Sequence, residues 1–340
     1  MIFVMHTPIV IKQNKNCMPH PWHPSVVYKP EGWNGFKYWM AQTPYPPIEV
    51  LPYVDRYELP CIHFSNDGIH WSSIESNPID DLTEDMIARH NYYSDPHLLI
   101  RENRMECYYR LTLLVDQQLE NNKTLLLRKT SLDGFVWSES EIVADLRKDS
   151  DIDIWGRQII SQAVMWDKNQ YKCWYVDRSG YLVDRKINLT TSYDGIHWMK
   201  YVQCSLKGKN IDPWHIDVQY YDKKYQMIVF DMRGLSWFES DDGISFTFVS
   251  EILYPTRFFV DFYSEGLYRA CSVKVDDVIN IYFSAKNENR ASIGLLRTNN
   301  RLSFQYIDGM HKLHYLIEYI LPNLSYKKCK YIIKRMLREM

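Results

Sequence analysis

The chain of 340 residues lacks most of the local signatures that identify a site from sequence. Its seven cysteines are odd in number, and none lies in a CxxC motif or at the Cys/His spacing of a metal site, so we interpret them as small reduced core residues. No glycine-rich loop matches a P-loop or a dinucleotide fingerprint, and no nucleophile elbow is visible. These absences argue against phosphate-loop enzymes and elbow-type serine hydrolases.

Long hydrophobic stretches are also absent. No segment reaches about 18 consecutive apolar residues, and the N-terminus has no charged region followed by an apolar stretch of signal-peptide length. The sequence therefore predicts a cytoplasmic protein, with peripheral contact at the inner face of the membrane as an alternative that depends on the C-terminal segment.

What the chain does contain is a repeated motif, S-x-D-G-x-x-W, at intervals of about 50 to 65 residues. Three copies begin at Ser65, Ser131 and Ser192, a fourth at Ser240 ends in Phe, and a degraded fifth begins at Thr298. The Asp-Gly pair supplies the positive φ of a tight hairpin turn, and the Asp carboxylate accepts backbone hydrogen bonds. Five copies predict five structural units.

A second repeated block precedes each motif and supplies two further strands. The first strands are expected at residues 23–28, 95–100, 161–166, 215–220 and 269–273, and the second strands at 36–40, 105–110, 171–175, 225–230 and 278–283. Each unit is then a four-stranded sheet, which predicts an all-β, five-bladed β-propeller over residues 1–309. The run Thr7–Ile11 is expected to close the ring by pairing with the last blade.

The C-terminal segment differs in charge from the rest of the chain. Residues 311–340 carry seven Lys and Arg against two Glu, a net charge of +5, which leaves −7 for the remainder. Apolar residues recur there at helical spacing, so residues 310–340 are predicted to form a short basic amphipathic α-helical tail. Residues 323–340 either lie on an anionic membrane or pack on the propeller or a second subunit. The acidic propeller disfavours nucleic acid as a partner.

Polar side chains recur at the start of the first strand of each predicted blade. These strands line the central channel of a propeller, so their first residues converge on one axis. Equivalent slots hold His23, Asp95, Ser161 and His215. Nearby positions add Gln162, Asp217, Glu265 and Arg269. A shared axial site is the prediction, and a solvated channel with structural waters is the alternative.

This arrangement resembles the five-bladed propellers of the glycoside hydrolases that include invertases, levansucrases, arabinanases and β-xylosidases, and of the related mannoside phosphorylases. The resemblance covers roughly residues 16–305 and rests on the x-x-P-x-V-x first strands, the Tyr- and Trp-rich second strands and the S-x-D-G-x-x-W motifs. It implies a carbohydrate-active protein that hydrolyses or transfers a glycosyl unit of an oligo- or polysaccharide. The expected cytoplasmic location favours work on intracellular oligosaccharide or in surface-polysaccharide metabolism, and the absence of cofactor motifs predicts no cofactor.

The resemblance also implies catalytic carboxylates. In that family an acidic residue, usually in an Asp-Pro pair, acts as base or nucleophile, a further Asp tunes its pKa, and a Glu donates the proton. Asp95-Pro96 matches such a pair, whereas His23-Pro24 stands where blade one is expected to carry Asp-Pro. Glycoside cleavage normally needs two carboxyl groups flanking the bond. The expected catalytic residues are Asp95, Asp217 and Glu265.

The expected substrate-binding side chains are Trp22, His23, Trp155, Gln162, Arg178, His215 and Arg269. The arginines and histidines would hold sugar hydroxyls or an acidic group, and the two tryptophans offer stacking faces. A metal on the axis, held by His20, His23, His97 and His215 with Asp95 or Asp217, was the competing interpretation. No pair of histidines has an i,i+4 spacing, so no metal site is predicted.

Two alternative functions remain at the level of sequence. A propeller that binds glycan without cleaving it is favoured by the missing blade-one carboxylate. A scaffold in a polysaccharide-assembly complex is favoured by the basic tail. A glycan array followed by product analysis separates these alternatives from an enzyme.

Overall fold

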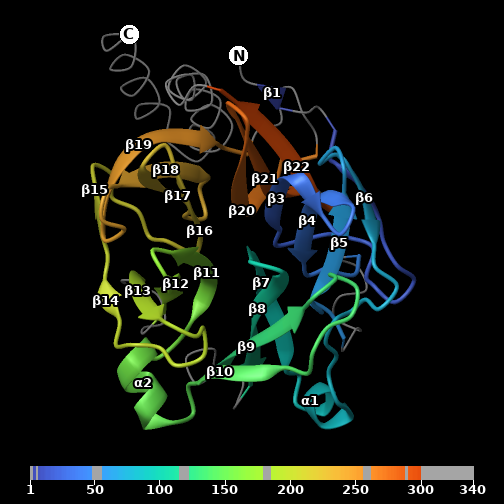
Figure 1. Ribbon diagram of the computed structural model, residues 1–340, viewed down its shortest axis with the longest axis horizontal. Helices are drawn as coiled ribbons and strands as arrows, with labels where there is room; N and C mark the ends of the chain where they lie inside the picture. Colours follow the sequence, from blue (N-terminus) through green and yellow to red (C-terminus); the bar gives the residue numbers. More distant parts are fainter. Residues whose placement is uncertain are drawn as a thin grey trace, which may run out of the picture.

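The computed structural model describes residues 3–4, 7–47, 56–114, 122–178, 185–255, 262–287 and 290–299. These residues form five sheets arranged in a ring around a central axis (Figure 1). Two short helices of the described chain, α1 (Glu84–Ala88) and α2 (Asp149–Trp155), lie outside the sheets, and neither is long and apolar enough to cross a membrane. The five-bladed all-β propeller is confirmed, and the predicted tail at residues 310–340 lies outside the described residues.

Each sheet is one blade, and its strands follow one another in the chain from the axis outward, except for the outermost strands β1, β2 and β15, which precede the rest of their blades in the chain. Blade one contains β3 (Ser25–Trp33), β4 (Phe36–Gln42), β5 (Cys61–Ser65), β6 (His70–Ser73) and β2 (Val10–Lys12). Blade two contains β7 (Tyr92–Arg101), β8 (Arg104–Leu113), β9 (Lys123–Ser131) and β10 (Glu141–Asp145). Blade three contains β11 (Ile160–Asp167), β12 (Gln170–Asp177), β13 (Lys186–Ser192) and β14 (Val202–Gln203).

The last two blades complete the ring. Blade four contains β16 (His215–Tyr221), β17 (Lys224–Phe230), β18 (Leu235–Ser240), β19 (Ser245–Leu253) and β15 (Ser205–Lys207). Blade five contains β20 (Gly266–Val275), β21 (Val278–Asn287), β22 (Arg290–Thr298) and β1 (Phe3–Val4). The innermost strands β3, β7, β11, β16 and β20 contact their neighbours in this order around the axis, which brings the starts of all five together.

The N-terminal residues close the ring, but through a different segment from the one expected. The strand β1 pairs antiparallel with β22, with Phe3 opposite Arg297 and Val4 opposite Leu296. The strand β2 instead pairs in parallel with β6 of blade one. The run at residues 7–11 contributes a single hydrogen bond to blade five, from Ile9 N to Ile293 O (2.9 Å). The prediction that this run is the closing strand is therefore wrong, because the two residues upstream of it that form β1 take that place.

The repeated motif forms the same turn in the four blades where it is described. In blade two, Ser131 Oγ accepts from Gly134 N (2.8 Å). Asp133 Oδ1 accepts from Phe135 N and Val136 N (both 2.8 Å). The equivalent bonds recur at the motifs that begin at Ser65, Ser192 and Ser240. The hydrogen bonds fix the turn, so the motif encodes local geometry and not chemistry.

Each motif glycine also packs against the blade before it. A Cβ atom added at Gly134 would lie 2.5 Å from the ring of Trp39 in blade one, and φ at this glycine is +80°. Gly68 meets Tyr282 of blade five in the same way, and Tyr282 Oη donates to Gly68 O (3.0 Å). Neighbouring blades are thus joined through residues of the motif itself.

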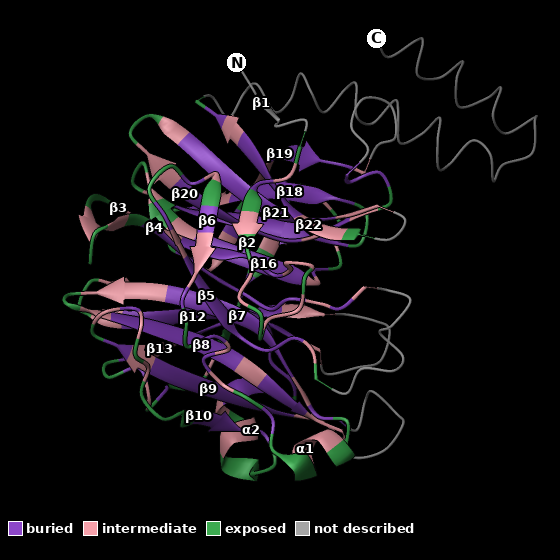
Figure 2. Ribbon diagram, turned by 90° about the vertical axis from the view of Figure 1, so that its right-hand side faces the viewer, coloured by how far each residue is buried: buried purple, intermediate pink, exposed green. Residues whose placement is uncertain are grey.

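The hydrophobic core consists of clusters between neighbouring blades. Figure 2 shows the buried residues along the strands and the exposed residues at the turns. The aromatic residue of the motif belongs to these clusters, as Trp71 does between blades one and five, Trp198 between blades two and three, and Phe246 between blades three and four. The six cysteines of the described residues are free thiols and five are buried.

His63 on β5 is expected to make the fold sensitive to acid. Burial lowers the pKa of this imidazole from 6.5 to about 3. Between these values the unfolded chain binds a proton that the folded chain does not, so stability is lost as pH falls. The cost is about 1.4 kcal/mol per pH unit. We therefore expect the free energy of unfolding, measured with urea between pH 7 and pH 5, to fall less steeply with decreasing pH in His63→Gln, by the equivalent of about one proton. Equal pH dependence in the two proteins would show that His63 is not the source of the acid sensitivity.

Candidate active site

Irregular pairing at the starts of three inner strands places side chains at the axis. The register shifts between Ser94 and His97 in β7, between residues 160 and 163 in β11, and between residues 267 and 270 in β20. The predicted slots of blades one to three share one backbone conformation, with φ of +54° at His23, +53° at Asp95 and +52° at Ser161. Bulges commonly re-aim side chains next to active sites. His215 differs, since it lies in a regular pair with Phe230.

Three of these side chains meet from blades one, two and four. Asp95 Oδ1 lies 3.4 Å from His215 Nδ1 and 4.0 Å from His23 Nε2. All three residues are buried, with at most 2% of their surface exposed. None of these three atoms has a hydrogen-bond partner among the described residues. Buried polar atoms are nearly always paired, so these three atoms are available to an ordered water or a ligand.

Two arginines fix the charge of Asp95. Arg110 Nε donates to Asp95 Oδ2 (2.6 Å), and Arg269 Nη1 lies 3.7 Å from Oδ1. Burial alone would raise the pKa of Asp95, but the Arg110 guanidinium, with Arg269 behind it, holds that pKa well below its usual range. Asp95 is therefore ionised at any physiological pH and is not a proton donor.

Both histidines of the group are neutral. Burial lowers the pKa of His23 to about 3 and that of His215 well below its usual value. His23 Nδ1 contacts Thr43 Oγ1 (2.7 Å), which orients the ring and leaves Nε2 directed at Asp95. A neutral imidazole cannot act as a cation here, but its free nitrogen lone pair is available to a ligand.

The group has the donor chemistry of a divalent cation site. His23, Asp95 and His215 each offer one ligand atom, and these atoms lie within 4.8 Å of one another. Two imidazoles and one carboxylate are a common set for a catalytic metal that keeps open positions. His97, also considered from sequence, is held by Val164 O (3.0 Å) and lies outside the set. The alignment of the blades placed all three residues at the axis, but no local spacing marked them as ligands because they come from three different blades.

Glu58 is the functional candidate that the sequence did not reveal. It lies in the connection between β4 and β5 and is 5% exposed. Burial raises its pKa to about 8, although a hydrogen bond with Ser94 and the charge of Arg110 oppose the shift. Its Oε2 atom has no hydrogen-bond partner within the described chain. No repeat contains Glu58, so no alignment of blades could have identified it.

Three of the predicted residues, Gln162, Asp217 and Arg269, surround the group without belonging to it. Gln162 Nε2 donates to the backbone oxygens of Asp95 and Tyr108, and Arg269 Nη2 donates to Gln162 O (3.2 Å). Asp217 accepts from Ser272 N (3.0 Å), and burial raises its pKa to about 6. These contacts connect the inner strands of blades two to five, so Gln162 and Asp217 hold the frame of the site.

Three predicted residues lie elsewhere. Trp155 is 1% exposed and packs in the core between blades two and three, so it has no free face for a sugar. Glu265, the residue before β20, is exposed, whereas the members of the buried group are at most 2% exposed, and the irregularity of β20 lies further on, between Leu267 and Ala270. Arg178 is half-buried and lies over the ring of Trp214, 5.3 Å from its centroid. The structure does not bring these three side chains to Asp95.

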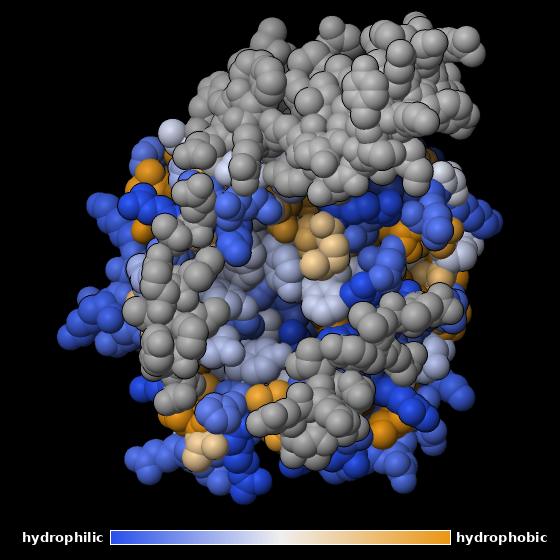
Figure 3. Space-filling model, turned by 180° about the vertical axis from the view of Figure 1, so that it is seen from behind, coloured by the Kyte–Doolittle hydropathy of each residue, from blue (hydrophilic) through white to orange (hydrophobic). Residues whose placement is uncertain are grey.

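An aromatic cavity of about 190 Å³ adjoins the group between blades one and five. Trp22, Tyr45 and Tyr268 line it, and the rings of Trp22 and Tyr268 stack with centroids 5.5 Å apart. Tyr268 also contacts His215, with ring centroids 4.2 Å apart. Figure 3 shows a hollow near the centre of one face, with hydrophilic and weakly polar side chains on its visible walls and floor.

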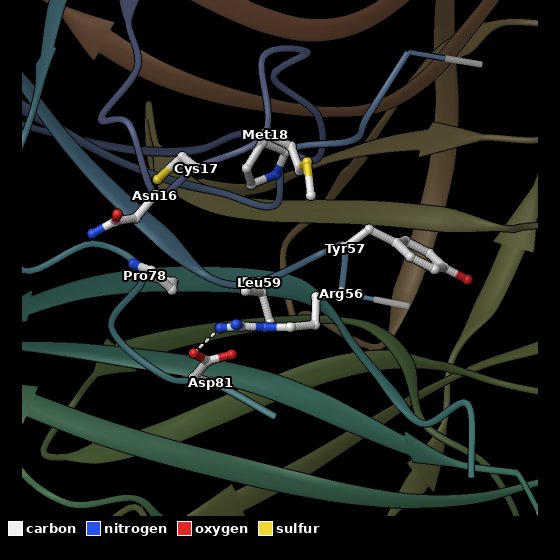
Figure 4. Close-up of a pocket in the computed structure, with 9 residues that line it drawn as sticks. Asn16, Cys17, Met18, Arg56, Tyr57, Leu59, Pro78 and Asp81 are labelled. Atoms are coloured by element: carbon white, nitrogen blue, oxygen red, sulfur yellow. Dashed lines mark hydrogen bonds and ion pairs between the residues drawn. The ribbon is translucent and has the colours of Figure 1, made fainter. Parts of the chain in front are cut away.

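A second cavity of about 310 Å³ has a different character. It is lined by residues of blade one and the start of blade two, among them Cys17, Met18 and Leu59 (Figure 4). Its charged residues, Arg56 and Asp81, form an ion pair with each other. Neither offers an unpaired charge to a ligand, so this cavity is not the candidate active site.

Comparisons with known proteins agree with this architecture. No protein-family model matches the chain. The A type blood N-acetyl-α-D-galactosamine deacetylase of Flavonifractor plautii is 26% identical over 237 residues, which are 58% of this chain but only 29% of that protein. The chain thus spans less than a third of the length of this curated relative.

Solved structures extend the likeness. An N-acetylgalactosamine deacetylase from F. plautii, in complex with blood group B trisaccharide, superposes with a TM-score of 0.69 at 19% identity over 89% of this chain and 98% of that one. The RS223 β-xylosidase gives 0.57 at 12% identity, covering 81% and 91%. A family 117 glycoside hydrolase of Zobellia galactanivorans gives 0.57 at 14% identity, covering 87% and 89%. This chain is therefore a five-bladed β-propeller that is related in fold to glycoside hydrolases and, in both fold and sequence, to an N-acetylgalactosamine deacetylase.

Proposed function

We propose that this carbohydrate-active propeller removes the acyl group from an N-acylated amino sugar with the aid of a divalent cation. The observation that carries the proposal is the buried His23–Asp95–His215 group, with three unpaired ligand atoms within 4.8 Å of one another. The sequence similarity to a deacetylase supports the same reaction class.

The donor set fits such a cation. Asp95 is ionised, both imidazoles are neutral, and Thr43 fixes the orientation of His23 in the manner of an outer-shell ligand. When bound, the cation would polarise the amide carbonyl and acidify a bound water. The two arginines partly neutralise Asp95. Arg269 Nε and Nη1 make no hydrogen bond within the described residues and are available to hold a substrate oxygen.

Glu58 is the group that moves protons in this proposal. A carboxyl with a pKa near 8 is close to the value that suits a general acid–base catalyst at neutral pH. Its ionised form accepts a proton from the attacking water, and its protonated form then donates one to the departing amine. Amide hydrolysis thereby yields a carboxylic acid and a free amino sugar.

Cleavage of a glycosidic bond is the second candidate, and one observation favours it. A protonated Glu58 near an ionised Asp95 is the combination of environments that separates acid from carboxylate in glycosidases. Glu265 is exposed and Asp217 accepts from Ser272 N, so Glu58 and Asp95 are the two carboxyl groups that we assign to this role.

Product analysis distinguishes the two reactions. We expect oligosaccharides with a terminal N-acetylgalactosamine to release acetate and no new reducing end. Dialysis against a chelator should abolish the release, and Mn²⁺ or Zn²⁺ should restore it. New reducing ends without acetate would establish the second candidate, and binding with neither product would leave a glycan-binding protein.

Matched variants locate the cation. His215→Gln removes one of the three ligand atoms and is expected to weaken Mn²⁺ binding, measured by titration calorimetry, by more than the roughly ten- to hundredfold that loss of an outer-shell partner causes. His63→Gln also replaces a buried neutral histidine, but one that contacts Gln13 and Ser73 on blade one, and is expected to bind Mn²⁺ as the unmodified chain does. Equal binding by all three proteins would exclude the His23–Asp95–His215 group as the site.

A further inference from the structure

The aromatic cavity beside the candidate active site has a composition that the proposed chemistry does not explain. Its lining comes from blade one, through Trp22 and Tyr45, and from blade five, through Tyr268, Lys286 and Ala291. Aromatic walls with a few polar groups are typical of small-ligand sites, in which the polar groups set orientation. The cavity therefore has the features of a binding site for one sugar residue.

The cavity and the buried group share a wall. Tyr268 stacks on Trp22 on one side and contacts both His215 and His23 on the other, with ring centroids 4.2 and 5.3 Å apart. Tyr45 also contacts His23, with ring centroids 6.1 Å apart. Only the ring of Tyr268 thus separates a sugar in the cavity from His215 and His23 of the candidate active site.

Lys286 gives this cavity a charge. Its side chain is half-buried, and its ammonium forms no hydrogen bond or ion pair with any residue in the part of the chain that the structure describes. No Asp or Glu is among the residues that line the cavity. A lysine beside aromatic walls, in a cavity whose lining contains no Asp or Glu, favours an anionic group on the ligand.

We propose that this cavity binds an anionic sugar residue, whose acidic group pairs with the Lys286 ammonium. The inference rests on the proposed function in that the bound residue belongs to the glycan substrate, and it names the substrate class as an acidic glycan. Trp22 and Tyr268 hold the ring of this sugar, and Lys286 selects its charge.

Direct binding tests the selection without any turnover. The probes are methyl α-D-galacturonide, methyl α-D-galactoside 6-sulfate and the neutral methyl α-D-galactoside, each titrated by calorimetry into the full chain at low salt. We expect both anionic probes to bind about tenfold more tightly than the neutral one, and the preference to shrink at high salt because the charges are partly solvated. The ratio between the two anionic probes tells a carboxylate from a sulfate.

Variants separate charge from packing. Lys286→Met should remove the preference and leave affinity for the neutral probe unchanged, whereas Trp22→Leu should weaken binding of all three probes. Lys37→Met removes an exposed lysine from the same pair of blades and should retain the preference. The inference is overturned if the unmodified chain binds the probes equally or not at all, or if Lys286→Met keeps the preference. A Lys286-dependent preference in a chain that releases no acetate would instead refute the proposed function alone.

Discussion

Replacing Asp95 by Asn is expected to lower kcat/KM for the glycan substrate by about 10³- to 10⁴-fold. Asn retains the shape of the side chain but removes the only charged ligand of the His23–Asp95–His215 group. The cation would lose its anionic partner, and Arg110 and Arg269 would face each other across a neutral amide. Acetate release and Mn²⁺ binding should fall together in this variant, and circular dichroism should report an intact propeller.

A matched control separates this effect from the general cost of removing a buried carboxylate. Glu106 is as buried as Asp95, and it also pairs with two arginines, Arg104 and Arg128, but it lies between blades two and three. Glu106→Gln is therefore expected to lower the melting temperature and to leave kcat/KM unchanged below it. If the two variants lose activity equally, Asp95 has no special role in the reaction.

The architecture could be predicted from sequence because it is encoded locally and repeatedly. The Ser, Asp and Gly of each motif fix a turn by hydrogen bonds within the motif, and the same bonds recur in four blades. Alignment of the blades also identified the axial positions of His23, Asp95 and Ser161. In the structure these three residues share the same backbone conformation with positive φ, which agrees with the alignment. Repetition turns local rules into a global fold.

The chemistry of the site was harder to predict because it depends on departures from the repeat. Glu58 lies in the connection between β4 and β5, outside the two repeated blocks on which the alignment of the blades rests. Trp155 was expected to offer a stacking face to a sugar, but α2 places it in the core. Glu265 was assigned by its nearness to blade five, whereas the bulge of β20 turns Tyr268 and Arg269 inward instead.

Glu58→Gln is expected to lower kcat by about 10²- to 10⁴-fold and to change KM little, because the carboxyl acts on protons and not on binding. In the unmodified chain, a base works only when ionised. Activity should therefore be lost as pH falls through the pKa of Glu58, by about tenfold per pH unit. That pKa is about 8 in the free chain, and a cation beside Asp95 stabilises the carboxylate and moves the midpoint lower.

The pH profile distinguishes a catalytic Glu58 from one that only supports the fold. Glu58→Gln should lack the acid limb, and its residual rate should be flat across that range. The variant should still bind Mn²⁺, since its side chain is not among the three that offer ligand atoms. Asp217→Asn provides the comparison: its carboxyl is equally enclosed but is held by Ser272 N, so the acid limb should persist in that variant. An unchanged limb in Glu58→Gln would assign the proton transfer to another group and return Glu58 to a structural role.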